Sequence, residues 1–215
     1  MMTRRVKGEG PAMNAVSADS GRLSSSIHVA TLLALLRAGE QSAAAAFNRI
    51  VRRMSPGELS LSLSPLSTLI KDEERHDSAL ATFSSVLPPI ALGDAATRGF
   101  FRRFESREST VHLARVAALD ACVCQVITRV LARANDRVLD SRLIVLLSNI
   151  RADEARHVRV TRDLARLLGA DLALLRGIDV EVRNGFARLL LARAPAFEAL
   201  RVDSTRLVAL IRREQ

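Results

Sequence analysis

The sequence predicts an all-α protein built around a four-helix bundle. Four segments carry apolar residues three and four positions apart, the spacing that places them on one face of a helix. No segment shows sustained alternation of apolar and polar residues, so we expect no strands. The connection between the second and third segments is long, about 20 residues, and the other two are short, which is typical of two helical hairpins joined by one crossover.

The first two predicted helices end at turn-forming residues. The first spans residues 24–54 and ends at Ser55-Pro56-Gly57, because proline and glycine terminate helices. The second presents its own apolar stripe, and Pro88-Pro89 closes it. In the long connection that follows, Asp94 is expected to cap a short helix that runs past Phe101.

The third and fourth predicted helices are similar in length to the first two. The third carries its apolar stripe over residues 113–130, and Asn135-Asp136 is expected to form the turn after it. The fourth carries its stripe over residues 143–164, and Gly169 ends it.

Two or three shorter helices are expected in residues 172–215. Pro195 interrupts them, and Asp203 is the expected cap of the last one. A length of 215 residues suits one domain. We therefore expect a mobile N-terminal tail, a four-helix bundle and a C-terminal helical extension of the same domain, at residues 1–24, 25–168 and 169–215.

The composition excludes several classes of protein. A hydrophobic fraction of 48% excludes a disordered or collagen-like chain. The two cysteines, Cys122 and Cys124, lie two positions apart in an apolar run, which excludes a disulfide scaffold. No stretch of about 20 apolar residues lacks charges, so we expect no membrane-spanning helix. The basic N-terminus has no apolar run behind it, so we expect a cytoplasmic protein without a secretory signal.

The net charge of +9 comes almost entirely from arginine. Lysine occurs only at Lys7 and Lys71, and the arginines are spread along the whole chain. Proteins that bind single-stranded nucleic acid usually stack bases on aromatic rings, but this chain has no tyrosine or tryptophan. The charge is compatible with a nucleic-acid partner, but we do not expect one.

Acidic residues interrupt each of the four apolar stripes. Every interruption falls among residues that should face the core, and the second and fourth also carry a histidine three positions after a glutamate. Residues i and i+3 share a helix face, so each Glu-x-x-His pair projects in one direction. The interrupting residues are Glu40, Glu73 with His76, Asp120, and Glu154 with His157.

The interruptions repeat along the chain. Residues 72–76 read Asp-Glu-Glu-Arg-His and residues 153–157 read Asp-Glu-Ala-Arg-His, an offset of 81 positions. Glu40 and Asp120 are separated by 80 positions. Each half of the bundle thus has one helix with a single acid and one helix with the Asp-Glu-x-Arg-His motif.

Four carboxylates in one core need compensating charge. Desolvating a single carboxylate costs several kcal/mol, and four of them repel one another. Two divalent cations would balance four carboxylates with two neutral imidazoles. Ligands of this mixed kind suit iron or manganese.

The order Glu40, Glu73-x-x-His76, Asp120, Glu154-x-x-His157 resembles that of the ferritin-like di-iron carboxylate proteins. This superfamily includes acyl-carrier-protein desaturases, bacterial multicomponent monooxygenases, the ribonucleotide reductase small subunit, aldehyde-deformylating oxygenases and a tRNA hydroxylase. The Asp-Glu-x-Arg-His motif is most similar to the corresponding motifs of the desaturases. The resemblance covers roughly residues 25–168 and implies a ferritin-like bundle around two metal ions.

The resemblance also implies roles for the six residues and their neighbours. Glu73 and Glu154 would bridge the metals, Glu40 and Asp120 would be terminal ligands, and each histidine would bind one metal. It further implies that acids preceding the motif glutamates bond the histidine of the opposite motif helix. The expected pairs are Asp72 with His157 and Asp153 with His76, with Arg75 and Arg156 neutralising the two aspartates.

The chain departs from the pattern at two points. The third-helix ligand is usually glutamate, whereas Asp120 is one methylene shorter. The absence of tyrosine excludes a tyrosyl-radical role. Cys124 lies one turn past Asp120 and is a candidate for the same cavity, with a small buried apolar role as the alternative. His28 and His112 have no acid at ligand spacing and are expected to be surface or core histidines.

The leading functional hypothesis is a non-haem di-iron oxidoreductase, an oxygenase that uses O2 to oxidise an organic small molecule. Its expected cofactor is two iron ions, with manganese as the alternative in one or both positions. Its expected partners are O2, the organic substrate, an external electron donor and a second copy of the chain in a homodimer. The alternatives are an iron-handling ferroxidase or storage protein, a tRNA hydroxylase, and a metal-free helical binding module, with manganese catalase chemistry as a minor option.

Overall fold

The computed structural model describes residues 13–88, 95–133 and 139–213, and every regular element in these ranges is an α-helix. Four of the helices are long, as the sequence predicts. In chain order the helices are α1 (Met13–Arg53), α2 (Pro56–Ser84), α3 (Ala95–Arg103), α4 (Ser109–Arg133), α5 (Ser141–Leu167), α6 (Leu172–Leu191), α7 (Ala194–Ala199) and α8 (Ser204–Arg212).

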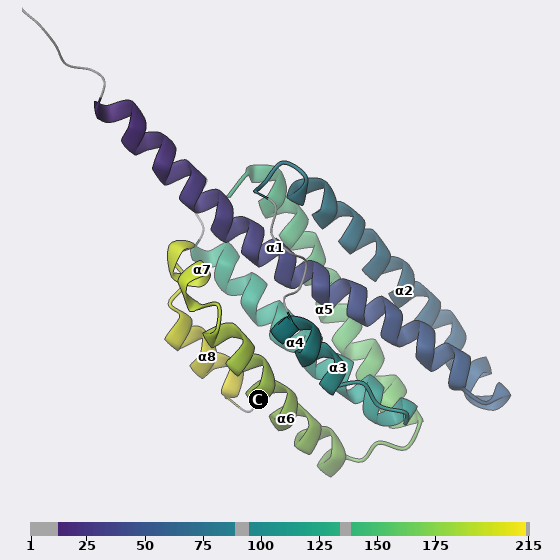
Figure 1. Cartoon of the computed structure of the whole chain (residues 1–215). Coiled ribbons are helices and arrows are strands. Elements are labelled where there is room, and N and C mark those ends of the chain that lie inside the picture. The colour runs from purple at the N-terminus through teal and green to yellow at the C-terminus, as the bar shows by residue number, and fades with distance from the viewer. Residues whose placement is uncertain (1–12, 89–94, 134–138, 214–215) are drawn as a thin grey trace, which may run out of the picture.

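The four long helices pack as two hairpins. α1 packs along α2, and α4 packs along α5 (Figure 1). The hairpins join through contacts of α1 with α4 and of α2 with α5, so each long helix has two long neighbours. The core between them is made of large side chains with almost no exposure, among them Leu33, Phe47, Leu69, Leu113 and Leu147.

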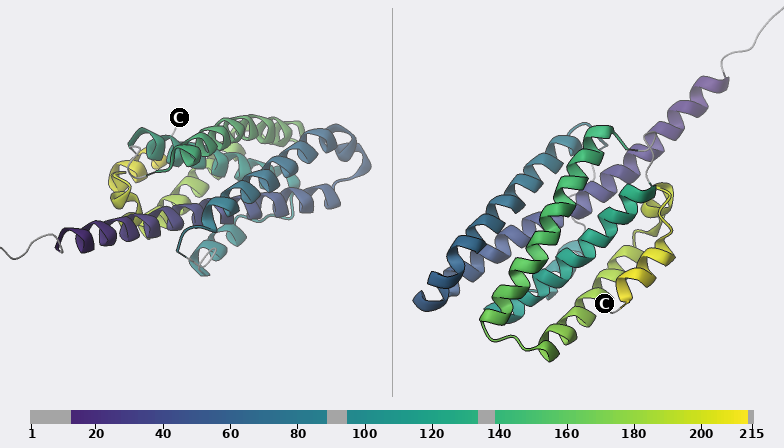
Figure 2. Two further views of the ribbon diagram at one scale, coloured as in Figure 1. Left: turned by 90° about the horizontal axis from the view of Figure 1, so that it is seen from above. Right: turned by 180° about the vertical axis from the view of Figure 1, so that it is seen from behind.

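The remaining helices cover one side of this bundle. α6 lies along α4 and carries α8, while α7 packs against α1 (Figures 1 and 2). The short helix α3 contacts both α1 and α6. Gly185 allows α6 to lie close to the end of α3, because a Cβ atom there would be 2.8 Å from Cζ of Phe104.

Several helix ends follow the predicted signals. Ser55 caps α2 in a reciprocal pair with Glu58, and Pro56 occupies the first turn, where no backbone donor is needed. Asp203 caps α8 by accepting from the backbone N–H of Arg206 at 2.8 Å. Gly169 follows α5 with a φ of 98°, a conformation that glycine adopts without strain.

Three boundaries differ from prediction or are not described. α1 begins at Met13, so residues 13–24, predicted as tail, extend this helix beyond the bundle (Figure 1); nothing after Pro11 in that stretch prevents a helix. α2 ends at Ser84, before the predicted stop at Pro88-Pro89. Asp94 and Asn135-Asp136 lie outside the described residues, as do residues 1–12.

One helix of the bundle is strongly apolar. The segment Ser109–Ala132 of α4 is long and apolar enough to cross a membrane, judged only by length and composition, with a mean hydropathy of 1.4. The segment contains the charged residues Arg115, Asp120 and Arg129, so the expectation that no stretch of about 20 apolar residues lacks charges still holds. Because 56% of the apolar window is buried, and because α4 packs against α1, α5 and α6, we attribute its composition to its central place in the bundle.

Candidate metal centre

The six predicted ligands come together in the interior of the bundle. α1 supplies Glu40, α2 supplies Glu73 and His76, α4 supplies Asp120, and α5 supplies Glu154 and His157. None is more than 6% exposed. They form two groups whose ligand atoms lie within 4.8 Å of one another, Glu40–Glu73–His76–Glu154 and Asp120–Glu154–His157, and Glu154 belongs to both.

The two histidines are placed almost symmetrically. Their ring centroids are 5.9 Å apart and their planes differ by 26°. Nδ1 of His76 lies 3.1 Å from Oε2 of Glu40 and 3.6 Å from Oε1 of Glu154. Nδ1 of His157 lies 3.1 Å from Oε1 of Glu73 and 3.7 Å from Oε2 of Glu154. Both Nδ1 atoms therefore face the carboxylates, and Glu154 contacts the two rings with its two different oxygens.

The outer nitrogens meet the aspartates that the sequence predicts. Nε2 of His76 is 3.1 Å from Oδ2 of Asp153, and Nε2 of His157 is 3.4 Å from Oδ2 of Asp72. Each contact crosses between α2 and α5. A carboxylate that accepts the Nε2 proton fixes the ring orientation and leaves Nδ1 as the atom directed into the cluster.

The two predicted arginines link these aspartates. Arg156 donates to Asp72 at 2.8 Å and to Asp153 at 2.9 Å. Arg75 contacts Asp153 at 2.8 Å and Asp72 at 2.9 Å. Burial would raise the pKa of Asp72, but its hydrogen bond and charge interaction with Arg156 outweigh burial, so the pKa is lowered. Asp153 behaves in the same way, so both acceptors are ionised.

Without a bound cation, the cluster must hold protons. Burial is the main cause that raises the pKa of Glu40, Glu73 and Asp120 well above the usual range, with repulsion from Glu154 adding to it. Burial alone would lower the pKa of His157, but its hydrogen bonds with Glu154 and Glu73 raise that pKa to about 11. Burial would raise the pKa of Glu154, but the hydrogen bonds with the two histidines lower it.

The unsatisfied atoms of the cluster fit a pair of metal ions. Oε1 of Glu73, Oδ2 of Asp120 and Nδ1 of His157 are buried and have no hydrogen-bond partner of good geometry among the described residues. Buried polar atoms are rarely left so, because each costs about 1–3 kcal/mol. All three belong to predicted ligands and are of the types that bind iron or manganese. Four carboxyls and two imidazoles thus fit two divalent cations once their protons leave.

A cavity begins at this cluster. It encloses about 770 Å³ of space between protein atoms, part of it open to solvent. Glu40, Glu73, Asp120 and Glu154 line one part, and side chains of α1, α3, α4 and α6 line the rest. These further walls are mainly apolar, with Leu35, Leu36, Ala43, Phe101, Phe104, Val116, Leu119, Val123 and Phe186 among them.

Cys124 does not line this cavity, which corrects the prediction. Its sulfur lies 3.6 Å from the carbonyl oxygen of Arg151 on α5, and Val123 faces the cavity instead. Burial raises the pKa of the Cys124 thiol to about 12. The cysteine is therefore a protonated packing residue, which is the alternative that the sequence left open.

Sequence reasoning missed two residues of the cavity wall, His112 and Arg115. His112 was expected to be an ordinary surface or core histidine, and it is buried and lines the cavity. The cavity face of α4 follows the positions 112, 115, 116, 119, 120 and 123, which is helical spacing on both sides of Asp120. Extending the helix face outward from Asp120 would have found both residues. His28 belongs to neither ligand group.

Comparison with known protein families, curated proteins and solved structures finds no match to this chain. The assignment of the buried carboxylate and histidine cluster as a candidate metal centre therefore depends on the residues and their geometry alone.

Proposed function

We propose that this protein is a non-haem di-iron oxidoreductase with a ferritin-like bundle, which uses O2 to oxidise an organic small molecule. The observation that carries the proposal is Glu154, whose two carboxylate oxygens lie between Nδ1 of His76 and Nδ1 of His157. A carboxylate in this position suits a bridge between two ions, each held by one histidine. Two irons bound there would supply the electrons and the open coordination positions that reduction of O2 requires.

The chain's own residues hold and shield such a centre. Asp153 and Asp72 accept the Nε2 protons of the two histidines, so that Nδ1 of each ring is the ligand atom. None of the six ligands is more than 6% exposed, so little of their surface is open to bulk water. Asp120, the short acid on α4, lines the cavity, so substrate bound there would lie beside the centre.

The cavity favours an oxygenase over an iron-storage protein. Iron ions need only a polar path to the ligands, whereas the walls of this cavity outside the ligand cluster are mainly apolar and include leucine, valine and phenylalanine side chains. Apolar cavities with a few polar groups are typical of sites for organic ligands. We propose O2 and an organic small molecule as the reactants, with an external electron donor, in a cytoplasmic homodimer.

The number of Fe(II) ions that each chain oxidises with O2 tests this function. The metal-free protein is titrated anaerobically with Fe(II) and then exposed to O2, while Fe(III) absorbance and O2 consumption are recorded. We expect oxidation to stop at about two Fe(II) per chain without substrate and reductant. Continued oxidation of many Fe(II) per chain would contradict the proposal and favour iron storage.

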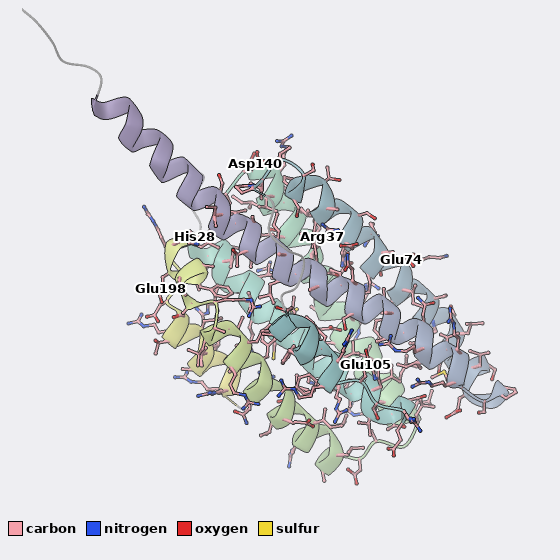
Figure 3. All side chains as sticks on the ribbon, in the orientation of Figure 1. His28, Arg37, Glu74, Glu105, Asp140 and Glu198 are labelled. Atoms are coloured by element: carbon pink, nitrogen blue, oxygen red, sulfur yellow. The ribbon has the colours of Figure 1, made fainter. Side chains whose placement is uncertain are left out.

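A matched pair of variants controls this experiment. Glu73 is a predicted ligand, whereas its neighbour Glu74 is exposed on the outer side of α2 (Figure 3). Glu73→Ala should abolish the rapid oxidation of two Fe(II), and Glu74→Ala should retain it. An equal response of the two variants would show that oxidation occurs elsewhere.

A further inference from the structure

Two residues of the cavity wall carry buried hydrogen-bond donors that no described residue satisfies. Nε2 of His112 and Nε of Arg115 are both buried without a hydrogen-bond partner among the described residues. Both residues line the same cavity as the carboxylate cluster, three positions apart on α4. Leaving such donors unsatisfied costs about 1–3 kcal/mol each, so their presence on a cavity wall points to a ligand that accepts from them.

His112 is fixed as a neutral donor. Its Nδ1 accepts the backbone N–H of Ser106 at 2.9 Å, which requires the remaining proton to be on Nε2. Burial, together with the charges of Arg49, Arg115 and Arg53, lowers the pKa of His112 to about 4. At neutral pH the ring therefore offers one N–H, from Nε2.

Arg115 is held in place by the other atoms of its guanidinium group. Nη1 contacts the carbonyl oxygens of Phe104 and Glu105 at 3.5 and 3.4 Å. Nη2 contacts the carboxylate of Glu181 at 3.4 Å, and the group lies 5.9 Å from the centre of the Phe104 ring. Nε–H is the donor that remains, and a fixed arginine with a spare donor is well suited to an anionic oxygen.

The surrounding charge favours an anion at this end of the cavity. Arg49, Arg53 and Arg115 are close enough to lower the pKa of His112. Of the nearby acids, Glu105 is paired with Arg49 at 2.9 Å and Glu181 lies at the outer side of Arg115. Glu105 follows α3 at the front of the molecule in Figure 3, in the connection between α3 and α4. The three arginines, Arg49, Arg53 and Arg115, thus outnumber the two glutamates that pair with them, Glu105 and Glu181.

The distance to the metal centre sets the size of the ligand. His112 precedes Asp120 by eight positions and Arg115 precedes it by five, which corresponds to about 12 and 8 Å along the helix axis. The wall between them is apolar, formed on α4 by Val116 and Leu119. A ligand held at both donors would place an apolar body against this wall with its far end beside Asp120.

We infer that the substrate is an apolar monocarboxylate whose carboxylate accepts hydrogen bonds from Nε2 of His112 and Nε of Arg115. One carboxylate has two oxygens for two donors, whereas a phosphate would leave further oxygens without partners in this apolar surrounding. The inference rests on the proposed function only in calling the bound monocarboxylate a substrate. The binding site itself depends only on the two donors and the cavity.

Binding of octanoate and of 1-octanol, measured by calorimetry on metal-loaded anaerobic protein, tests the inference. We expect octanoate to bind at least about 10-fold more tightly than octanol, because hydrogen bonds to a charged group are stronger than those to a neutral one. Metal content is measured on the same samples. Equal binding of the two probes, absence of octanoate binding, or tighter binding of octyl phosphate would overturn the inference.

Four variants locate the binding site. Arg115→Gln should weaken octanoate binding by roughly 10-fold or more and leave metal content unchanged. His112→Asn keeps an acceptor for the Ser106 N–H but loses the Nε2 donor, so it should also weaken octanoate binding, and His112→Gln should recover part of the loss. Arg206→Gln removes an exposed positive charge on α8 and should have no effect. Undiminished octanoate binding in Arg115→Gln and in His112→Asn would overturn the inference.

The two proposals fail separately in this design. Two metals per chain without a preference for octanoate would overturn the carboxylate site and leave the proposed function standing. Arg115-dependent octanoate binding in a protein that takes up no metal would support the carboxylate site and overturn the proposed function.

Discussion

Nε2 of His76 on α2 lies 3.1 Å from Oδ2 of Asp153 on α5, the residue directly before Glu154. The reciprocal contact joins His157 on α5 to Asp72, the residue directly before Glu73 on α2. Each motif therefore supplies a ligand pair to the cluster and an acceptor to the histidine of the opposite motif. This exchange explains why both motifs begin with aspartate: the acid orients a ring on the other helix.

The first prediction concerns these orienting aspartates. Asp153→Asn keeps the size of the side chain but replaces the ionised acceptor of the His76 Nε2 proton. We expect metal affinity to fall by roughly 10–100-fold, since carboxylates that orient metal-binding histidines have effects of this size. Competition with a chromogenic chelator measures the affinity. Asp163→Asn, an exposed site on the same helix, is the control, and an equal loss in both variants would contradict the assigned role.

The second prediction concerns the stability of the metal-free protein between pH 7 and 9. The pKa of His157 is raised from 6.5 to about 11, so in this window the folded state holds a proton that the unfolded state has released. The free energy of unfolding should therefore fall as pH rises, by about 1.4 kcal/mol per pH unit from this group. Urea titrations at several pH values measure the slope.

Two controls identify His157 as the source of that slope. His157→Gln should remove this contribution, while His28→Gln should retain it. Loading with Mn(II) should also abolish the decline, because a metal at Nδ1 replaces the proton there. A decline of unchanged steepness in His157→Gln would show that other groups cause it.

The third prediction concerns the close approach of α6 to the end of α3. A Cβ atom on Gly185 would lie 2.8 Å from Cζ of Phe104 and 3.2 Å from Cε2 of Phe100, two buried and mutually packed rings. Gly185→Ala should destabilise the protein by about 1–3 kcal/mol through overpacking. The higher helix propensity of alanine offsets part of this loss. Gly177, on the same helix, has no atom within 4 Å of such a Cβ.

Gly177→Ala is accordingly the matched control, and it should stabilise the protein by about 0.5–1 kcal/mol. Thermal unfolding of the two variants gives the comparison. A stabilising Gly185→Ala would mean that Phe104 moves aside without cost, and would argue against a rigid wall at that part of the cavity.

The sequence predicted the long helices and the six clustered side chains for the same reason. Glu40, Glu73 and Glu154 each interrupt an apolar stripe, and a charged residue on a core-facing stripe requires a partner inside the bundle. The offsets of 80 and 81 positions then related the two halves. Helical periodicity and the avoidance of unpaired buried charge are local rules, so they can be read from the chain directly.

What the sequence did not predict depends on contacts between distant segments. Val123 and Cys124 lie on opposite sides of Asp120 in helical projection, about 60° and 40° away, and the packing of α4 on α5 decides which one faces the cavity. His112 is kept neutral by burial and by nearby arginines, and its Nδ1 accepts the backbone N–H of Ser106 from outside α4. The start of α1 at Met13 was missed because polar and small residues in 13–24 hid a continuous helix.

Metal content per chain decides whether the buried carboxylate and histidine cluster is a metal site. Elemental analysis is made on protein from iron-supplemented cells, on Glu73→Ala and Glu154→Ala, and on Glu74→Ala as the exposed control. We expect about two irons per chain in the wild type and in Glu74→Ala, and loss of iron in both ligand variants. A wild-type protein that keeps its helical fold but holds no metal under these conditions would contradict it.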